Sequence, residues 1–125
     1  MIASTIRISA LAALALVATS AAAAPTQARS NFDGTWSVLI VTQRGECDRG
    51  YRYPVHISNG AVGYAGEAAF NVTGRVGNNG AITVTVSRGD KSARGTGQLS
   101  GVSGSGAWRT SAGECSGTWT AERRS

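Results

Sequence analysis

One histidine and two cysteines are the residues of this sequence best suited to acid–base, nucleophilic or metal chemistry. His56 stands between Val55 and Ile57, so in an alternating strand its ring points to the polar side, and no orienting carboxylate is identifiable beside it. The positions of Cys47, Cys115 and His56 match no usual spacing of zinc ligands. We therefore expect neither an enzyme nor a metal site.

Three carboxylates lie close to the cysteines in the sequence, at Glu46, Asp48 and Glu114. Calcium prefers oxygen ligands of this kind, but their order does not follow an EF-hand loop. Arg44 and Arg49 also offer these carboxylates internal charge compensation. The pattern favours a polar, charged loop over a cation site, and we expect no cofactor.

The N-terminus has the three-part pattern of a secretory signal. Arg7 precedes an apolar run at 8–17, which a series of small residues follows. The apolar run is shorter than the roughly 20 residues of a membrane-spanning helix. We predict cleavage between Ala23 and Ala24, with a second choice after Ala28. A secreted or periplasmic protein without a membrane span is therefore expected.

Removal of the signal peptide, 1–23, leaves a short polar leader, 24–31, and one domain, 32–125. This length supports one hydrophobic core and is too short for two. The chain has a net charge of +5, and Lys91 is its only lysine. Such a charge suits an anionic partner, although it more often serves solubility. The arginines are dispersed without exposed aromatic residues, which does not favour a nucleic-acid partner.

The two cysteines predict one structural disulfide, Cys47–Cys115. An exported chain enters an oxidising compartment, and a small domain gains stability from such a crosslink. Two cysteines allow only one intramolecular pairing.

Alternating apolar and polar residues recur along the domain, whereas no helix-length segment has apolar residues at a 3.6-residue period. Turn-forming pairs such as Asn59-Gly60 separate the alternating segments. We predict eight strands, at 34–43, 51–58, 61–65, 68–76, 81–87, 91–100, 102–110 and 115–123. Short connections make neighbouring strands antiparallel, and closing the meander into an up-and-down barrel pairs both edge strands. In that barrel Cys47 and Cys115 lie together, where the first strand ends and the last begins.

One phase of the alternation predicts the barrel interior: Trp36, Val38, Ile40, Tyr53, Val55, Ile57, Val62, Tyr64, Phe70, Val72, Val76, Ile82, Val84, Val86, Leu99, Val102, Trp108 and Trp119. The other phase places four mid-strand arginines on the outer wall: Arg52, Arg75, Arg94 and Arg109. Pro54 within the second strand predicts a bulge or irregular pairing there.

Four glycines occupy inward positions of the sixth and seventh strands: Gly95, Gly97, Gly104 and Gly106. They leave space in which the core tryptophans Trp36, Trp108 and Trp119 can press on bare backbone. A barrel of eight strands is just wide enough for packed side chains or for one small ligand. We expect a packed interior, with a ligand cavity as the alternative.

The two ends of the predicted barrel differ in charge. The turns at one end contain no charged residue, whereas the loops at the disulfide end and their flanks contain nine: Arg44, Glu46, Asp48, Arg49, Glu67, Arg88, Asp90, Lys91 and Glu114. Recognition often uses loops carried by a rigid framework. We therefore expect a partner-binding face formed by Arg44, Glu46, Asp48, Arg49, Arg88 and Lys91.

The segment Phe32-Asp-Gly-Thr-Trp36 resembles the G-x-W start of the calycin barrels, lipocalins and avidins, and Gly117-Thr-Trp119 repeats the motif in the last strand. This resemblance implies an eight-stranded barrel and a carrier of a small apolar ligand. It does not extend to biotin, because Ser-Val-Leu-Ile-Val after Trp36 is too apolar for an avidin site. The chain is also similar to small exported bacterial single-disulfide barrels of unassigned function, and to metalloprotease-inhibitor barrels.

These patterns together favour a non-enzymatic binding or inhibitory module. It would act through the charged loops of the disulfide end on a macromolecule that the sequence does not identify. A calycin-type carrier of a small apolar ligand is the alternative.

Overall fold

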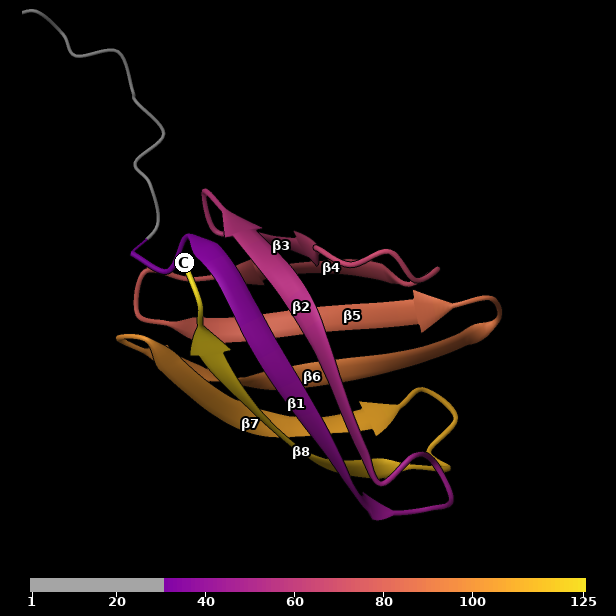
Figure 1. Ribbon diagram of the computed structural model, residues 1–125. Helices are drawn as coiled ribbons and strands as arrows, with labels where there is room; N and C mark the ends of the chain where they lie inside the picture. The colour runs from indigo at the N-terminus through magenta and orange to yellow at the C-terminus, as the bar shows by residue number, and fades with distance from the viewer. Residues whose placement is uncertain (1–30) are drawn as a thin grey trace, which may run out of the picture.

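Eight antiparallel strands follow one another in chain order around a closed barrel (Figure 1). The computed structural model describes residues 31–125, so the predicted signal peptide and the leader up to residue 30 lie outside the described residues. The strands are β1 Gly34–Arg44, β2 Gly50–Ser58, β3 Ala61–Tyr64, β4 Asn71–Val76, β5 Ala81–Arg88, β6 Lys91–Ser100, β7 Ser103–Thr110 and β8 Ser116–Arg123. β1 pairs with both β2 and β8, which closes the barrel. The predicted eight-stranded meander is therefore confirmed.

The predicted disulfide is present at the seam of the barrel. Cys47 lies in the loop after β1, and Cys115 directly precedes β8. Their Cα atoms are 6.2 Å apart, and the crosslink spans 68 residues of sequence. It therefore joins the first and last strands beside their pairing.

The predicted irregularity at Pro54 is wrong. The β1–β2 register runs through the Ser37–Pro54 pair without a shift. The other edge of Pro54 faces Ala65, just past the end of the four-residue β3, and its carbonyl accepts a hydrogen bond from the Ala65 amide at 3.2 Å. The edge at which Pro54 lacks an amide proton thus faces a residue beyond the end of the β2–β3 ladder, so no ladder hydrogen bond is lost. The register shift lies instead between Thr42 and Arg44 of β1, opposite β8.

Two further details differ from the sequence prediction. β4 begins at Asn71 rather than at residue 68, because 65–70 form a loop over the end of the barrel. Val102, predicted to point inward, is 65% exposed because it lies in the turn between β6 and β7. Within residues 31–125 no helix is long and apolar enough to span a membrane.

The end of the barrel that carries the C-terminus is closed by buried side chains. Trp36 and Ile57 are each 1% exposed there, and Leu99 is 2% exposed. The indole Nε1 of Trp36 donates to the carbonyl oxygen of Phe32 at 2.8 Å, so its polar atom is satisfied. The guanidinium of Arg123 lies 5.2 Å from the Trp36 ring centroid. Among residues 31–125, these buried side chains cover this end of the barrel.

Trp119 lies against inward glycines, as the small residues of β6 and β7 predicted. A Cβ atom added to Gly97 would meet the Trp119 ring at 2.6 Å, and one added to Gly106 would meet its Nε1 at 2.7 Å. That Nε1 donates to the carbonyl oxygen of Thr96 at 3.1 Å. Any larger residue at either glycine would have to displace the indole or the backbone.

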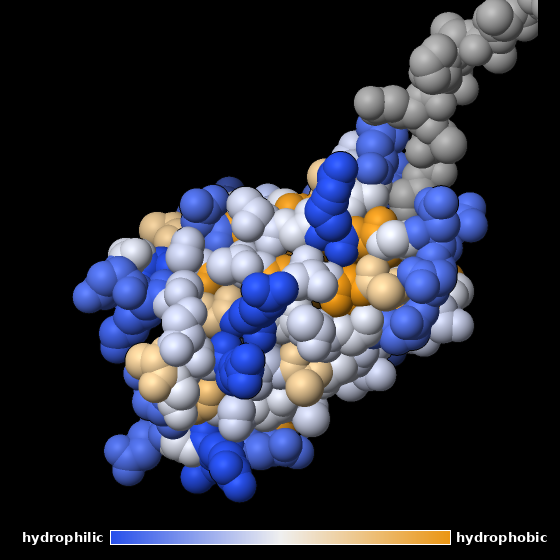
Figure 2. Space-filling view, turned by 180° about the vertical axis from the view of Figure 1, so that it is seen from behind, coloured by the Kyte–Doolittle hydropathy of each residue, from blue (hydrophilic) through white to orange (hydrophobic). Residues whose placement is uncertain are grey.

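The outer wall carries the polar phase of the strands. Figure 2 shows one side of it, on which hydrophilic and weakly polar residues predominate and hydrophobic atoms are visible only in small patches. The four mid-strand arginines are exposed on this wall, as predicted: Arg52, Arg75, Arg94 and Arg109.

Candidate functional site

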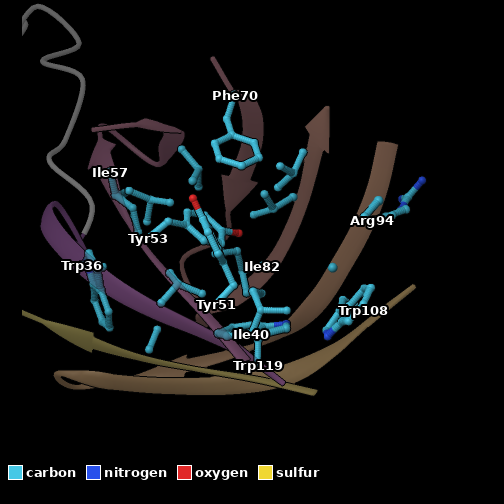
Figure 3. Close-up of a pocket in the computed structure, with 18 of the residues that line it drawn as sticks. Trp36, Ile40, Tyr51, Tyr53, Ile57, Phe70, Ile82, Arg94, Trp108 and Trp119 are labelled. Atoms are coloured by element: carbon cyan, nitrogen blue, oxygen red, sulfur yellow. The ribbon is translucent and has the colours of Figure 1, made fainter. Parts of the chain in front are cut away.

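The barrel interior is packed at the closed end and hollow toward the disulfide end. The hollow is a cavity of about 200 Å³, so the expectation of a fully packed interior is wrong. Aromatic and branched aliphatic side chains line it (Figure 3), among them Trp36, Ile40, Tyr53, Ile82, Trp108 and Trp119. All three tryptophans of the chain therefore contact one cavity.

Small residues on β6 explain why space remains. Ala93 and Gly95 line the cavity and face large side chains carried by β1 and β2. The Trp119 indole fills the space over Gly97, but at Gly95 its nearest atom is 3.5 Å from the position of an added Cβ. The interior between Ala93 and the opposite wall is consequently left open.

Side-chain exposure shows where the cavity opens. Ile57, near the closed end of β2, is 1% exposed, Tyr53 is half-buried, and Tyr51 at the other end of the strand is 38% exposed. On β1 Trp36 is buried and Ile40 is half-buried, while Thr42 beyond them is buried again and its hydroxyl donates to the carbonyl oxygen of Asp48 in the loop after β1. The mouth of the cavity therefore lies at the disulfide end, among the loops 45–49, 65–70, 89–90 and 111–115.

An aromatic cluster forms one side of this mouth. The ring centroid of Phe70 lies 5.7 Å from that of Tyr51, 6.3 Å from that of Tyr53 and 5.6 Å from that of Tyr64. Figure 3 shows the hydroxyl oxygens of Tyr51 and Tyr53 among the apolar lining. Neither hydroxyl makes a hydrogen bond to another residue of the described range 31–125. Both are thus available to a polar group of a bound molecule.

Tyr51 was missed in the sequence analysis. It lies two residues before Tyr53, in the same inward phase of β2. The predicted strand 51–58 already began at Tyr51, so applying the alternation from its first residue would have placed Tyr51 in the interior with Tyr53.

Ionisation of Tyr53 is expected to destabilise the protein at alkaline pH. Burial, with a smaller contribution from Tyr51, raises the pKa of Tyr53 from 10.0 to about 12. The unfolded chain loses this proton near pH 10.0, whereas the folded protein keeps it up to about pH 12. The stabilising contribution is therefore fully present below the lower pKa and is lost as the pH rises to the upper one. Because the ring borders an open cavity, we expect a loss of no more than about 2 kcal/mol.

Urea unfolding below pH 10.0 and near pH 12 measures this loss. Tyr53→Phe should remove it, while Tyr51→Phe should keep most of it. An undiminished alkaline loss in the Tyr53→Phe variant would show that another group is responsible.

The six residues of the expected partner-binding face all lie at the disulfide end and are exposed: Arg44, Glu46, Asp48, Arg49, Arg88 and Lys91. Arg88 and Lys91 are register partners at the end of the β5–β6 hairpin. The Arg88 guanidinium lies 5.3 Å from the Phe70 ring centroid, which places it beside the mouth of the cavity. None of the six makes an ion pair with another residue between 31 and 125. They form a charged rim around an apolar opening.

His56 is exposed on the outer wall of β2, away from this cavity. Its Nδ1 lies 3.5 Å from the hydroxyl of Thr35. The described part of the chain contains no cluster of three or more histidine, cysteine, aspartate or glutamate side chains arranged to hold a metal ion.

The candidate site is thus an apolar cavity with two free phenol groups and a charged rim. No protein-family model, curated protein or solved structure matches this chain.

Proposed function

We propose that this protein binds a small, largely apolar molecule inside its barrel. The observation that carries the proposal is the cavity of about 200 Å³, closed at one end and lined by aromatic and aliphatic side chains. A cavity whose lining is almost entirely apolar holds water weakly and takes up apolar guests, because water finds few polar partners in it. The likeness of Gly34-Thr-Trp36 to the calycin motif favours the same function.

The volume restricts the size of the ligand. A cavity of about 150 Å³ accommodates benzene, whereas the pockets of drug-sized ligands begin at about 300 Å³. The cavity of about 200 Å³ therefore suits a molecule with a single ring or a short branched chain. The free hydroxyls of Tyr51 and Tyr53 favour a ligand with one polar substituent near the mouth.

This proposal gives the charged residues of the disulfide end a role at the rim, where they keep the mouth hydrated. A macromolecular partner or an inhibited enzyme at Arg44, Arg49 and their neighbours stays a prediction from the sequence. We place the protein in the periplasm or outside the cell, and a disulfide is consistent with such an oxidising compartment.

Filling the cavity is expected to abolish ligand uptake. Ala93 is half-buried and lines the cavity, so a phenyl ring at this position takes up much of the free volume. With toluene and p-cresol as probes, calorimetric titration should show that Ala93→Phe weakens binding by about tenfold or more. The wild-type protein should bind p-cresol about fivefold more tightly than toluene, since p-cresol can exchange a hydrogen bond with a tyrosine hydroxyl.

Ala61→Phe provides the matched control, because Ala61 is exposed on the outer wall at the start of β3. It should bind both probes as the wild type does. The proposal fails if neither probe binds the wild type, or if the two variants bind the probes equally.

A further inference from the structure

We propose that a basic hollow on the outer wall of the barrel, formed by β6, β7, β8 and the end of β1, binds a phosphate group. The hollow shares Arg94 and Trp108 with the lining of the interior cavity but is otherwise lined mainly by polar residues, and the inference does not depend on the proposed function. It rests on the strand register, on the charges of the outer wall and on the shape of the surface there.

The register brings three arginines into one row across four adjacent strands. Arg94 of β6 lies directly opposite Arg109 of β7. Arg109 lies opposite Ser116 of β8, and Ser116 in turn lies opposite Arg44 of β1. Arg94 and Arg109, both exposed, therefore project side by side from the outer wall, and the register places the backbone of Arg44 at the same level, beyond the shift between Thr42 and Arg44.

No ion pair with a residue of 31–125 compensates the charges of this row. Like charges directly opposite each other on neighbouring strands destabilise a sheet. The side chains of Arg94 and Arg109 make no hydrogen bond or ion pair with another residue of the described barrel. An anion bound between the two guanidinium groups would remove this repulsion.

The surface at the row is hollowed and rich in hydrogen-bond donors. A hollow of about 400 Å³ is lined by Gln43, Arg94, Thr96, Ala107, Trp108, Arg109, Ser116 and Gly117. The small side chain of Ala107, between Thr96 and Thr118 in the register, leaves the space open. No carboxylate lines the hollow.

These groups fit the chemistry of phosphate. A guanidinium offers a planar pair of N–H donors that matches two phosphate oxygens. Two guanidinium groups favour phosphate over a carboxylate, because a carboxylate has only two oxygens and a single negative charge. The hydroxyls of Thr96 and Ser116 and the amide of Gln43 supply further neutral donors. The phosphate is either a free ion or the terminal phosphate of a lipid headgroup.

Calorimetric titration with inorganic phosphate, at an ionic strength held constant with sodium chloride, tests the proposal. We expect the double variant Arg94→Gln/Arg109→Gln to bind phosphate at least about tenfold more weakly than the wild type. In thermal unfolding, phosphate should raise the midpoint of the wild type above its value in chloride and leave that of the double variant unchanged. The double variant should also be no less stable than the wild type in chloride, because it removes a repulsion.

Arg52→Gln/Arg75→Gln is the matched control, since it removes the same two charges from elsewhere on the outer wall. Vesicles of phosphatidylcholine with and without phosphatidic acid separate the two sources of the phosphate group. Binding to inorganic phosphate or selectively to phosphatidic acid vesicles, lost only in the Arg94/Arg109 variant, supports the site. The proposal is overturned if both double variants lose the same amount of binding. It is also overturned if the wild type shows no effect of phosphate beyond that of chloride and binds phosphatidic acid vesicles no better than phosphatidylcholine vesicles.

Discussion

Replacement of Trp36 by alanine is expected to lower the free energy of unfolding by about 3–5 kcal/mol. Trp36 is 1% exposed, and its indole occupies the closed end of the barrel, where the Arg123 guanidinium lies over it. The substitution leaves a large void that a closed sheet cannot collapse to fill, and it removes the hydrogen bond that the Trp36 indole donates to the carbonyl oxygen of Phe32. A loss of this size approaches the whole stability of many small domains.

Urea unfolding followed by circular dichroism measures the effect. Trp36→Phe should retain most of the packing and lose only the hydrogen bond to Phe32 and part of the ring volume, so its loss should be clearly smaller. Val102→Ala is a surface control, because Val102 is 65% exposed; it should change the stability by no more than about 0.5 kcal/mol. If Trp36→Ala were as mild as Val102→Ala, the closed end would not be the packed plug that the burial indicates.

Removal of the disulfide is expected to have the second large effect. The crosslink spans 68 residues, and in the chain-entropy model a loop of that length stabilises the folded state by about 4 kcal/mol. It also ties β1 to β8 at the seam, where the sheet closes on itself. The double variant Cys47→Ala/Cys115→Ala should therefore unfold at a lower urea concentration, with an unchanged strand content below the transition.

Alanine is the suitable replacement because Cys115 is 2% exposed, and a serine there would bury an additional hydroxyl. A thiol reductant should lower the midpoint of the wild type to about that of the double variant and leave the variant itself unaffected. A wild-type midpoint that does not respond to complete reduction would contradict a stabilising role for the crosslink.

Local patterns carried most of the information about the fold. The alternation of apolar and polar residues has a period of two in every strand, so each segment shows which of its faces is buried. Turn residues mark the reversals, and a meander with two edges gains hydrogen bonds by closing. The placement of Cys47 and Cys115 at the expected seam follows from this topology. The error at Val102 arose in a turn beyond the end of β6, and the error at Pro54 arose opposite the end of the neighbouring β3, where the pairing and not the local pattern decides what proline disturbs.

The candidate sites depended on relations that no single segment contains. The free space beside Ala93 is the difference between the volume that the barrel encloses and the combined volumes of the side chains that eight strands place inside it. Which end opens depends on the short β3 and on the loop at 65–70, whose Phe70 gathers three tyrosines at the mouth.

By itself the sequence determined that this chain forms a disulfide-linked antiparallel barrel with apolar residues inside and arginines outside. Strand periodicity and turn chemistry are local properties, because each depends on residues that are adjacent in the sequence. Only the tertiary structure decided that the interior holds a cavity, that it opens beside the charged loops, and that Arg94, Arg109 and Arg44 share a row. The register between strands sets these juxtapositions, and the register results from the closure of the whole sheet.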